Sequence, residues 1–130
     1  MSFPLLLAGI VAIVGFALHL VMGEHAVMRF RPSSQDREER RWRGWLQVRA
    51  GWHLGSFQLL AVAVFLLFAG FGDLIVGEKV LVTWVGFYFF ASGLVWLGLL
   101  AWSDRGLRQA SRLFEWAFHI GIGGCCFLGA

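Results

Sequence analysis

The sequence predicts an all-α integral membrane protein, an up-down-up-down bundle of four transmembrane helices that forms a single domain over residues 1–130. Of the 130 residues, 58% are hydrophobic and only 15% are charged, which is too little charge to cover the outer faces of a soluble bundle. Long apolar runs separate the clusters of charge, and about 20 helical residues suffice to cross the ~30 Å hydrocarbon core. The period-2 alternation of a membrane barrel is absent.

The apolar runs define the predicted spans, because backbone groups in hydrocarbon have no water to bond and must form helices. The spans cover residues 3–22, 50–71, 80–102 and 113–130. The fourth run is the weakest, since it contains Glu115 and His119, and a re-entrant or interfacial tail is the alternative. The first run is expected to be an uncleaved span, because only "MSF" precedes it and "LVMGEH" lacks the small-residue cleavage pattern.

The basic residues set the predicted orientation. Only Lys79 lies in the loop on one side of the predicted membrane, whereas ten arginines lie on the other side. These are Arg29, Arg31, Arg37, Arg40, Arg41, Arg43, Arg49, Arg105, Arg108 and Arg112. The positive-inside rule makes the arginine-rich loops cytoplasmic, with both termini outside the cytoplasm of the inner (plasma) membrane. Topology thus accounts for the net charge of +3 without nucleic acid, and contact with membrane lipid headgroups follows.

The largest predicted connection is the cytoplasmic loop over residues 24–49. Pro32 interrupts the first helix, and Ser33 followed by Asp36 resembles a capping box from which a helix continues into the second span. The turns near residues 70–79 and 103–106 are short, so neighbouring helices are expected to be antiparallel.

Three histidines on three predicted helices fall at similar depth in the cytoplasmic half. His19 and His53 each lie three residues from the inner end of their spans, roughly 5 Å along the helix. His119 lies six residues into its span, roughly 9 Å from the inner end. His25 follows just outside the first span, beside Glu24. Ionisable residues inside a membrane are functional hypotheses by default, so this level is the candidate site.

The neighbours of these histidines extend the pattern into two polar seams. Arg49, His53 and Ser56 share one helix face, and Arg112, Glu115 and His119 share another. Because polar groups that face lipid are costly, both seams and His19 are expected to point into the bundle. Glu24 and His25 would lie at the rim of this site.

The predicted chemistry is the binding of haem b or of a transition-metal ion. Imidazoles from separate helices suit haem iron, with His19, His53, His119 and Arg49 as the cofactor-binding residues. A transition metal would take His19, His53, His119 and Glu115. Glycines near the histidines leave room for a flat macrocycle, and quinone binding is a third use of the same residues. The expected role is electron transfer, or service as a subunit of a redox complex.

Other interpretations of the same residues stay open. A histidine near a helix end is often interfacial, and "GWHLG" is a G-x-x-x-G packing motif. A small oligomeric transporter or ion or proton channel is one rival, although no charge lies near the bilayer midplane. A non-catalytic accessory subunit of a larger membrane complex, or a homo-oligomer, is the other.

Enzymatic activity is not predicted, because no nucleophile–base pair, Walker loop, H-E-x-x-H or C-x-x-C motif is present. Cys125 and Cys126 near the outer end of the fourth run are expected to be small packing residues, with a strained disulfide or a soft-metal contact as the alternative.

Overall fold

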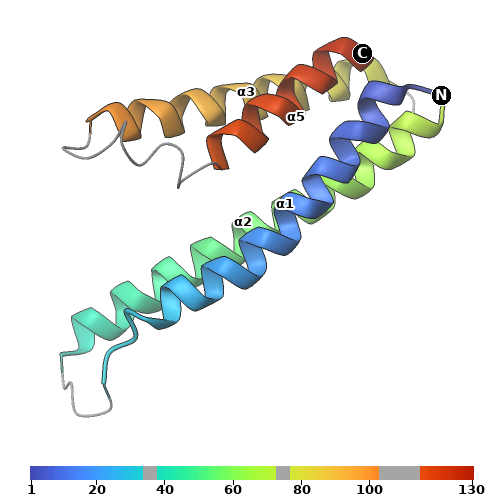
Figure 1. Ribbon diagram of the computed structural model, residues 1–130. Helices are drawn as coiled ribbons and strands as arrows, with labels where there is room; N and C mark the ends of the chain where they lie inside the picture. The colour runs from blue at the N-terminus through green and yellow to red at the C-terminus, as the bar shows by residue number, and fades with distance from the viewer. Residues whose placement is uncertain (34–37, 73–76, 103–114) are drawn as a thin grey trace.

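The computed structural model describes residues 1–33, 38–72, 77–102 and 115–130. Within these ranges the chain forms four α-helices and no strand (Figure 1). The helices are α1 (Phe3–Met28), α2 (Glu39–Phe71), α3 (Glu78–Trp102) and α5 (Glu115–Gly129). Consecutive helices run in opposite directions. The predicted all-helical class is therefore confirmed.

Three of the described helices, α1, α2 and α3, are long and apolar enough to cross a membrane. Helix α5 is not, because its 15 residues extend only about 22 Å, short of the ~30 Å hydrocarbon core. The prediction of a fourth span over residues 113–130 is thus wrong. The described helix begins only at Glu115, a charged residue in its first turn.

Helices α1 and α2 are longer than the predicted spans. Helix α1 continues past residue 22 to Met28, and α2 begins at Glu39 and runs without a break into its apolar part. The predicted continuity of the basic segment with the second span is confirmed, and most of the expected loop 24–49 is helical.

The predicted capping box reaches into residues 34–37, and the turn at 103–106 with Arg105, Arg108 and Arg112 also lies outside the described residues.

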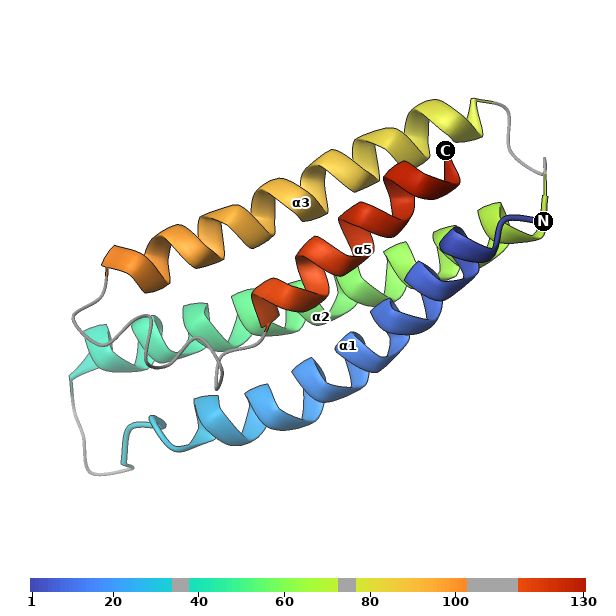
Figure 2. The ribbon, with the colours of Figure 1, turned by 45° about the horizontal axis from the view of Figure 1, so that its top comes forward.

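The helices are arranged as two antiparallel pairs. Helix α1 packs along α2, and α3 packs along α5, while α2 and α3 scarcely touch. The pairs contact each other mainly through α1 and α5, and in Figure 2 α5 lies between α3 and the first pair. They are closest at the end that holds both termini, where the Ser2 hydroxyl donates to the carbonyl oxygen of Gly129 at 3.5 Å, and they diverge toward the other end (Figure 1).

Small residues every three or four positions form the contact between α1 and α2. The buried residues of α1 are Leu5, Ala8, Gly9, Ala12, Gly15, Gly23 and Val27. Those of α2 are Trp45, Ser56, Leu59, Ala63, Leu66, Ala69 and Gly70. Small side chains let membrane helices approach closely, and a Cβ at Gly9 would lie 2.8 Å from the side chain of Leu67. His19 and Ser56 continue these two stripes, so packing alone turns them toward each other.

The core near the termini is apolar. Ala8, Ala12, Ala63, Leu66 and Ile122 have no exposed surface, and they form one cluster with Cys126. Cys125 and Cys126 are free thiols, the first half-buried and the second buried. Cys126 is a packing residue, as predicted.

Replacing Gly123 with alanine should destabilise the contact between α3 and α5. The added Cβ would lie 2.8 Å from the backbone nitrogen of Phe90 and 2.9 Å from the carbonyl oxygen of Gly86, so the helices would have to separate. We expect Gly123→Ala to lower the free energy of unfolding by about 1–3 kcal/mol, the usual range for overpacking. Gly124→Ala is the control, because open space surrounds that position. Equal denaturation midpoints of the two variants in detergent would contradict this packing.

Candidate functional site

A polar contact between α1 and α2 is centred on His19 and Trp52. The imidazole lies flat on the indole, with ring centroids 4.1 Å apart and planes 7° apart. The indole Nε1–H donates to the backbone carbonyl of His19 at 2.7 Å. Gly23 is the residue that admits the indole, because a Cβ there would lie 1.6 Å from Trp52 Nε1. The glycine therefore serves to seat Trp52, which in turn holds the His19 ring.

The hydrogen bonds of Ser56 determine the tautomer of His19. The Ser56 hydroxyl donates to the carbonyl of Trp52 at 3.2 Å, and its oxygen lies 2.9 Å from His19 Nδ1. Because the hydroxyl proton is already used, Ser56 accepts from Nδ1, which must carry the imidazole proton. His19 Nε2 is then an unprotonated acceptor, and it has no hydrogen-bond partner among the described residues.

His119 on α5 has the same tautomer for a different reason. Its Nδ1 lies 2.8 Å from the backbone carbonyl oxygen of Glu115, one turn earlier. A carbonyl only accepts, so Nδ1 carries the proton here too and Nε2 keeps its lone pair. The ring also stacks on Phe89 of α3, with centroids 5.3 Å apart. Two histidines on separate helices thus have their Nδ1–H groups fixed and their Nε2 lone pairs unused.

Both imidazoles line one small cavity between the two helix pairs, which we call the histidine cavity. Its walls are Gly15, Leu18, His19, Met22, Trp52, Leu59, Glu115, Phe118 and His119. About 40 Å³ of it is open to the centres of water molecules. One water needs roughly 10–15 Å³ in this measure, so the cavity has room for about three waters.

A carboxylate oxygen of Glu115 is the third unused acceptor. Its Oε2 is buried and has no hydrogen-bond partner within the described chain. The side chains of His19, His119 and Glu115 thus line one cavity, and each carries an acceptor atom without a hydrogen-bond partner among the described residues. A buried polar atom left unpaired costs free energy, so the occupant that best complements this cavity is a metal cation or a group rich in N–H or O–H donors.

A separate ion-pair cluster lies beside this cavity. Arg49 contacts Glu24 through two hydrogen bonds of 3.2 and 2.6 Å, and His53 Nε2 lies 3.2 Å from the same carboxylate. The guanidinium of Arg49 also lies 5.4 Å from the ring centroid of Trp45, whose indole N–H donates to the carbonyl of Val27 at 3.0 Å. This cluster joins the arginine-rich ends of α1 and α2.

The structure therefore divides the predicted site. It brings His19, His119 and Glu115 to one cavity, whereas His53 and Arg49 bind Glu24 and do not line that cavity. The physical reason is helical rotation, since Trp52 occupies the face toward α1 and its neighbour His53 is turned about 100° away. His25 is exposed and its Nδ1 bonds to the carbonyl of Val21.

Sequence reasoning did not single out Trp52, and it gave Glu24 only a place at the rim. A usable signal was present for Trp52. It continues the three- and four-residue spacing of the α2 stripe and lies opposite Gly23, the glycine that makes room for it.

The two predicted cofactors, a transition-metal ion and haem, differ in how well they fit the histidine cavity. No group of three or more His, Cys, Asp or Glu side chains among the described residues is arranged to hold a metal ion. An ion between His19 and His119 would therefore keep water ligands or draw Glu115 closer. A porphyrin is far larger than a cavity with room for about three waters. Haem would therefore require α1 and α5 to move apart.

The chain was compared with protein-family models, with curated proteins and with solved structures, and none of them matches it.

The tautomers give a direct spectroscopic prediction. In ¹⁵N NMR spectra of imidazole-labelled protein at a pH where the rings are neutral, His19 and His119 should carry the proton on Nδ1. His53 should show the opposite tautomer, because its Nε2 faces the Glu24 carboxylate and must donate to it. A protonated Nε2 on His19 or His119 would contradict the assignment. Ser56→Ala should abolish the preference at His19 and leave His119 unchanged.

Proposed function

We propose that the protein is an inner-membrane protein that binds a transition-metal ion in the histidine cavity, through Nε2 of His19 and Nε2 of His119. The observation that supports this most is that the Nδ1–H groups of both histidines are fixed by separate hydrogen bonds, which leaves a lone pair on each Nε2. Neutral imidazole with its Nδ1–H bonded to a second-shell oxygen is the usual form of a metal-binding histidine. Glu115 is the nearest anionic group on the cavity wall, and a carboxylate balances the charge of a divalent ion.

The size and surroundings of the cavity favour an ion over a larger ligand. Space for about three waters suits one ion with water in its open coordination positions. The apolar part of the cavity wall is formed by Leu18, Met22, Leu59 and Phe118. An apolar shell of this kind lowers the local dielectric constant and thereby affects the redox potential of a bound metal ion. We propose electron transfer, within a larger membrane assembly, as the role of a bound iron or copper ion.

Haem b is the second candidate. Its support is the separation of the two imidazoles onto different helix pairs, α1/α2 and α3/α5, as a bis-histidine ligation needs. Because α2 and α3 contact each other little, it is mainly the contact between α1 and α5 that opposes the opening that a macrocycle requires. An absorption spectrum separates the two candidates, since haem alone gives a Soret band that shifts on reduction.

Transport is less well supported than binding. Ala12, Ala63 and Ile122 of the apolar cluster have no exposed surface, and of the residues that line the histidine cavity only Leu59 belongs to that cluster. The cluster is packed closed near the termini, so we propose that an ion enters from the opposite, arginine-rich side. We place that side in the cytoplasm, with both termini outside, because the arginines lie there.

The proposal predicts that protein purified in mild detergent contains about one equivalent of a transition metal, or haem, per chain. His19→Ala and His119→Ala should each lose most of it, because each removes one of the two imidazole ligands. His25→Ala is the matched control, since His25 has the same kind of Nδ1 bond to a carbonyl on α1 but lies outside the cavity. Elemental analysis and the absorption spectrum measure the outcome. A wild-type protein that stays colourless and metal-free after incubation with iron, copper, zinc and haemin would refute it.

Removing the second-shell oxygen should weaken binding without removing a ligand. Ser56 is 2% exposed, and its hydroxyl fixes His19 Nδ1. We expect Ser56→Ala to reduce the affinity for the metal about 10–100-fold, as losses of second-shell partners do. Competition with a chelator measures the change. Ser92→Ala is the control, because the Ser92 hydroxyl only bonds to the carbonyl of Tyr88 on an exposed face of α3. Equal affinities of the two variants would exclude Ser56 from a role in orienting His19.

A further inference from the structure

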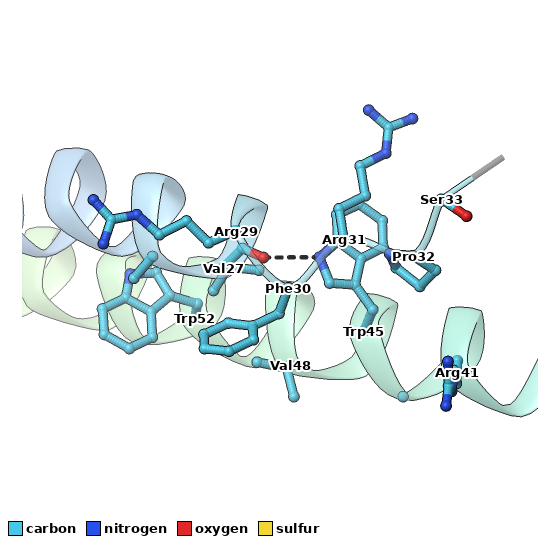
Figure 3. A pocket seen from close by; sticks show the side chains of 12 residues that line it. Val27, Arg29, Phe30, Arg31, Pro32, Ser33, Arg41, Trp45, Val48 and Trp52 are labelled. Carbon is cyan, nitrogen blue, oxygen red and sulfur yellow. Dashed lines mark hydrogen bonds between the residues drawn. The ribbon is translucent and has the colours of Figure 1, made fainter. Parts of the chain in front are cut away.

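A second and larger cavity lies at the arginine-rich end of the α1/α2 pair. It has a volume of about 770 Å³ and lies between the last turn of α1, the segment that follows it and the first turns of α2 (Figure 3). Its walls combine arginines with aromatic and aliphatic side chains, and none of its described lining residues is acidic. We call it the arginine pocket. The ligand-binding residues of the histidine cavity do not contribute to it.

The cationic side of the arginine pocket is formed by Arg29 and Arg31. Figure 3 shows both side chains on the side opposite Val48. The Arg31 guanidinium lies 5.8 Å from the ring centroids of both Trp42 and Trp45, a position that holds it without neutralising its charge. Arg29 has no ion-pair partner within the described chain. Two arginines that have no ion-pair partner among the described residues therefore line the pocket.

The opposite side of the arginine pocket is apolar. Figure 3 shows Phe30 between the indoles of Trp45 and Trp52, with Val48 next to it. Phe30 is 81% exposed, which is unfavourable in water and favourable against acyl chains. The indole N–H groups of Trp45 and Trp52 are already bonded to α1 carbonyls, so the rings are held in place.

We infer that the arginine pocket binds an anionic phospholipid, with its headgroup on the side of the pocket that carries Arg29 and Arg31 and the start of its acyl chains against Phe30 and Val48. The argument is charge complementarity joined to position. The pocket lies where the apolar helix α1 ends, at the level where tryptophans and arginines meet headgroups. A soluble anion would use the arginines but not the apolar side. Arg41 also lines the pocket and contributes less charge, since it pairs with Glu38 at 3.0 Å.

The test is native mass spectrometry of delipidated protein titrated with dioleoyl phosphatidylglycerol or dioleoyl phosphatidylcholine. Wild-type protein should bind the anionic lipid more tightly. The double variant Arg29→Gln, Arg31→Gln should lose about 25-fold in affinity for it, about five-fold for each arginine. The matched control is Arg40→Gln, Arg43→Gln, which removes the same charge from exposed positions on α2 outside the pocket and should leave the affinity within about two-fold.

Three results would overturn the inference. They are equal binding of the two lipids to wild-type protein, equal losses in the two double variants, and binding of glycerol 1-phosphate as tight as that of the whole lipid. Phe30→Ala tests the apolar side separately. It should weaken binding of dioleoyl but not of dihexanoyl phosphatidylglycerol, and an equal loss for both would remove the acyl-chain contact. All four arginines and Phe30 are exposed, so these variants keep the core intact, and circular dichroism confirms their helicity.

Discussion

The constraint on which the structure depends is that polar groups inside hydrocarbon must find their partners within the chain. Helices α1 and α2 satisfy this constraint with bonds to each other. Trp52 donates to the His19 carbonyl, and Ser56 accepts from His19 Nδ1. The Glu24 carboxylate pairs with Arg49 and His53. These bonds fix one register of α1 against α2, because a shift by one residue would break all of them together. The stripes of glycine and alanine let the helices come close enough for the bonds to form.

Three polar atoms do not satisfy this constraint, and they belong to side chains that line the same cavity. Nε2 of His19, Nε2 of His119 and Oε2 of Glu115 have no hydrogen-bond partner among the described residues, and all three side chains line the histidine cavity. Three acceptors without a donor, gathered from α1 and α5, are poorly explained by stability alone. They are well explained by an occupant that accepts electron pairs.

The sequence sufficed for the class of the protein and for part of the site. Run length and the clustering of charge predict the helices, and helical spacing places His19 and His119 at one depth. The same reasoning put His53 in the cavity, because depth says nothing about rotation around the helix axis. The rotation of α2 is set by Trp52, which needs the notch at Gly23, and that match is visible only when the two helices are aligned. The length of α5 was overestimated, since apolar composition alone does not show where a helix begins.

Trp52 also connects the two cavities, since it lines both. One indole separates the histidine cavity from the arginine pocket, and its N–H bond to the His19 carbonyl fixes it in that position. An occupant of either cavity thus contacts the residue that orients His19. The arginine-rich end of the α1/α2 pair is in this sense a single unit, while the apolar cluster near the termini holds the helix pairs together.

The central claim is that His19 and His119 offer their Nε2 atoms to one metal centre. The most direct measurement is a ¹⁵N NMR titration of imidazole-labelled protein with zinc as a diamagnetic ion. The account predicts that the Nε2 resonances of His19 and His119 move together to the range of metal-bound nitrogen and saturate at one ion per chain, while His25 stays unchanged. A response confined to His25 or His53, or shifts of His19 and His119 at different zinc concentrations, would contradict it.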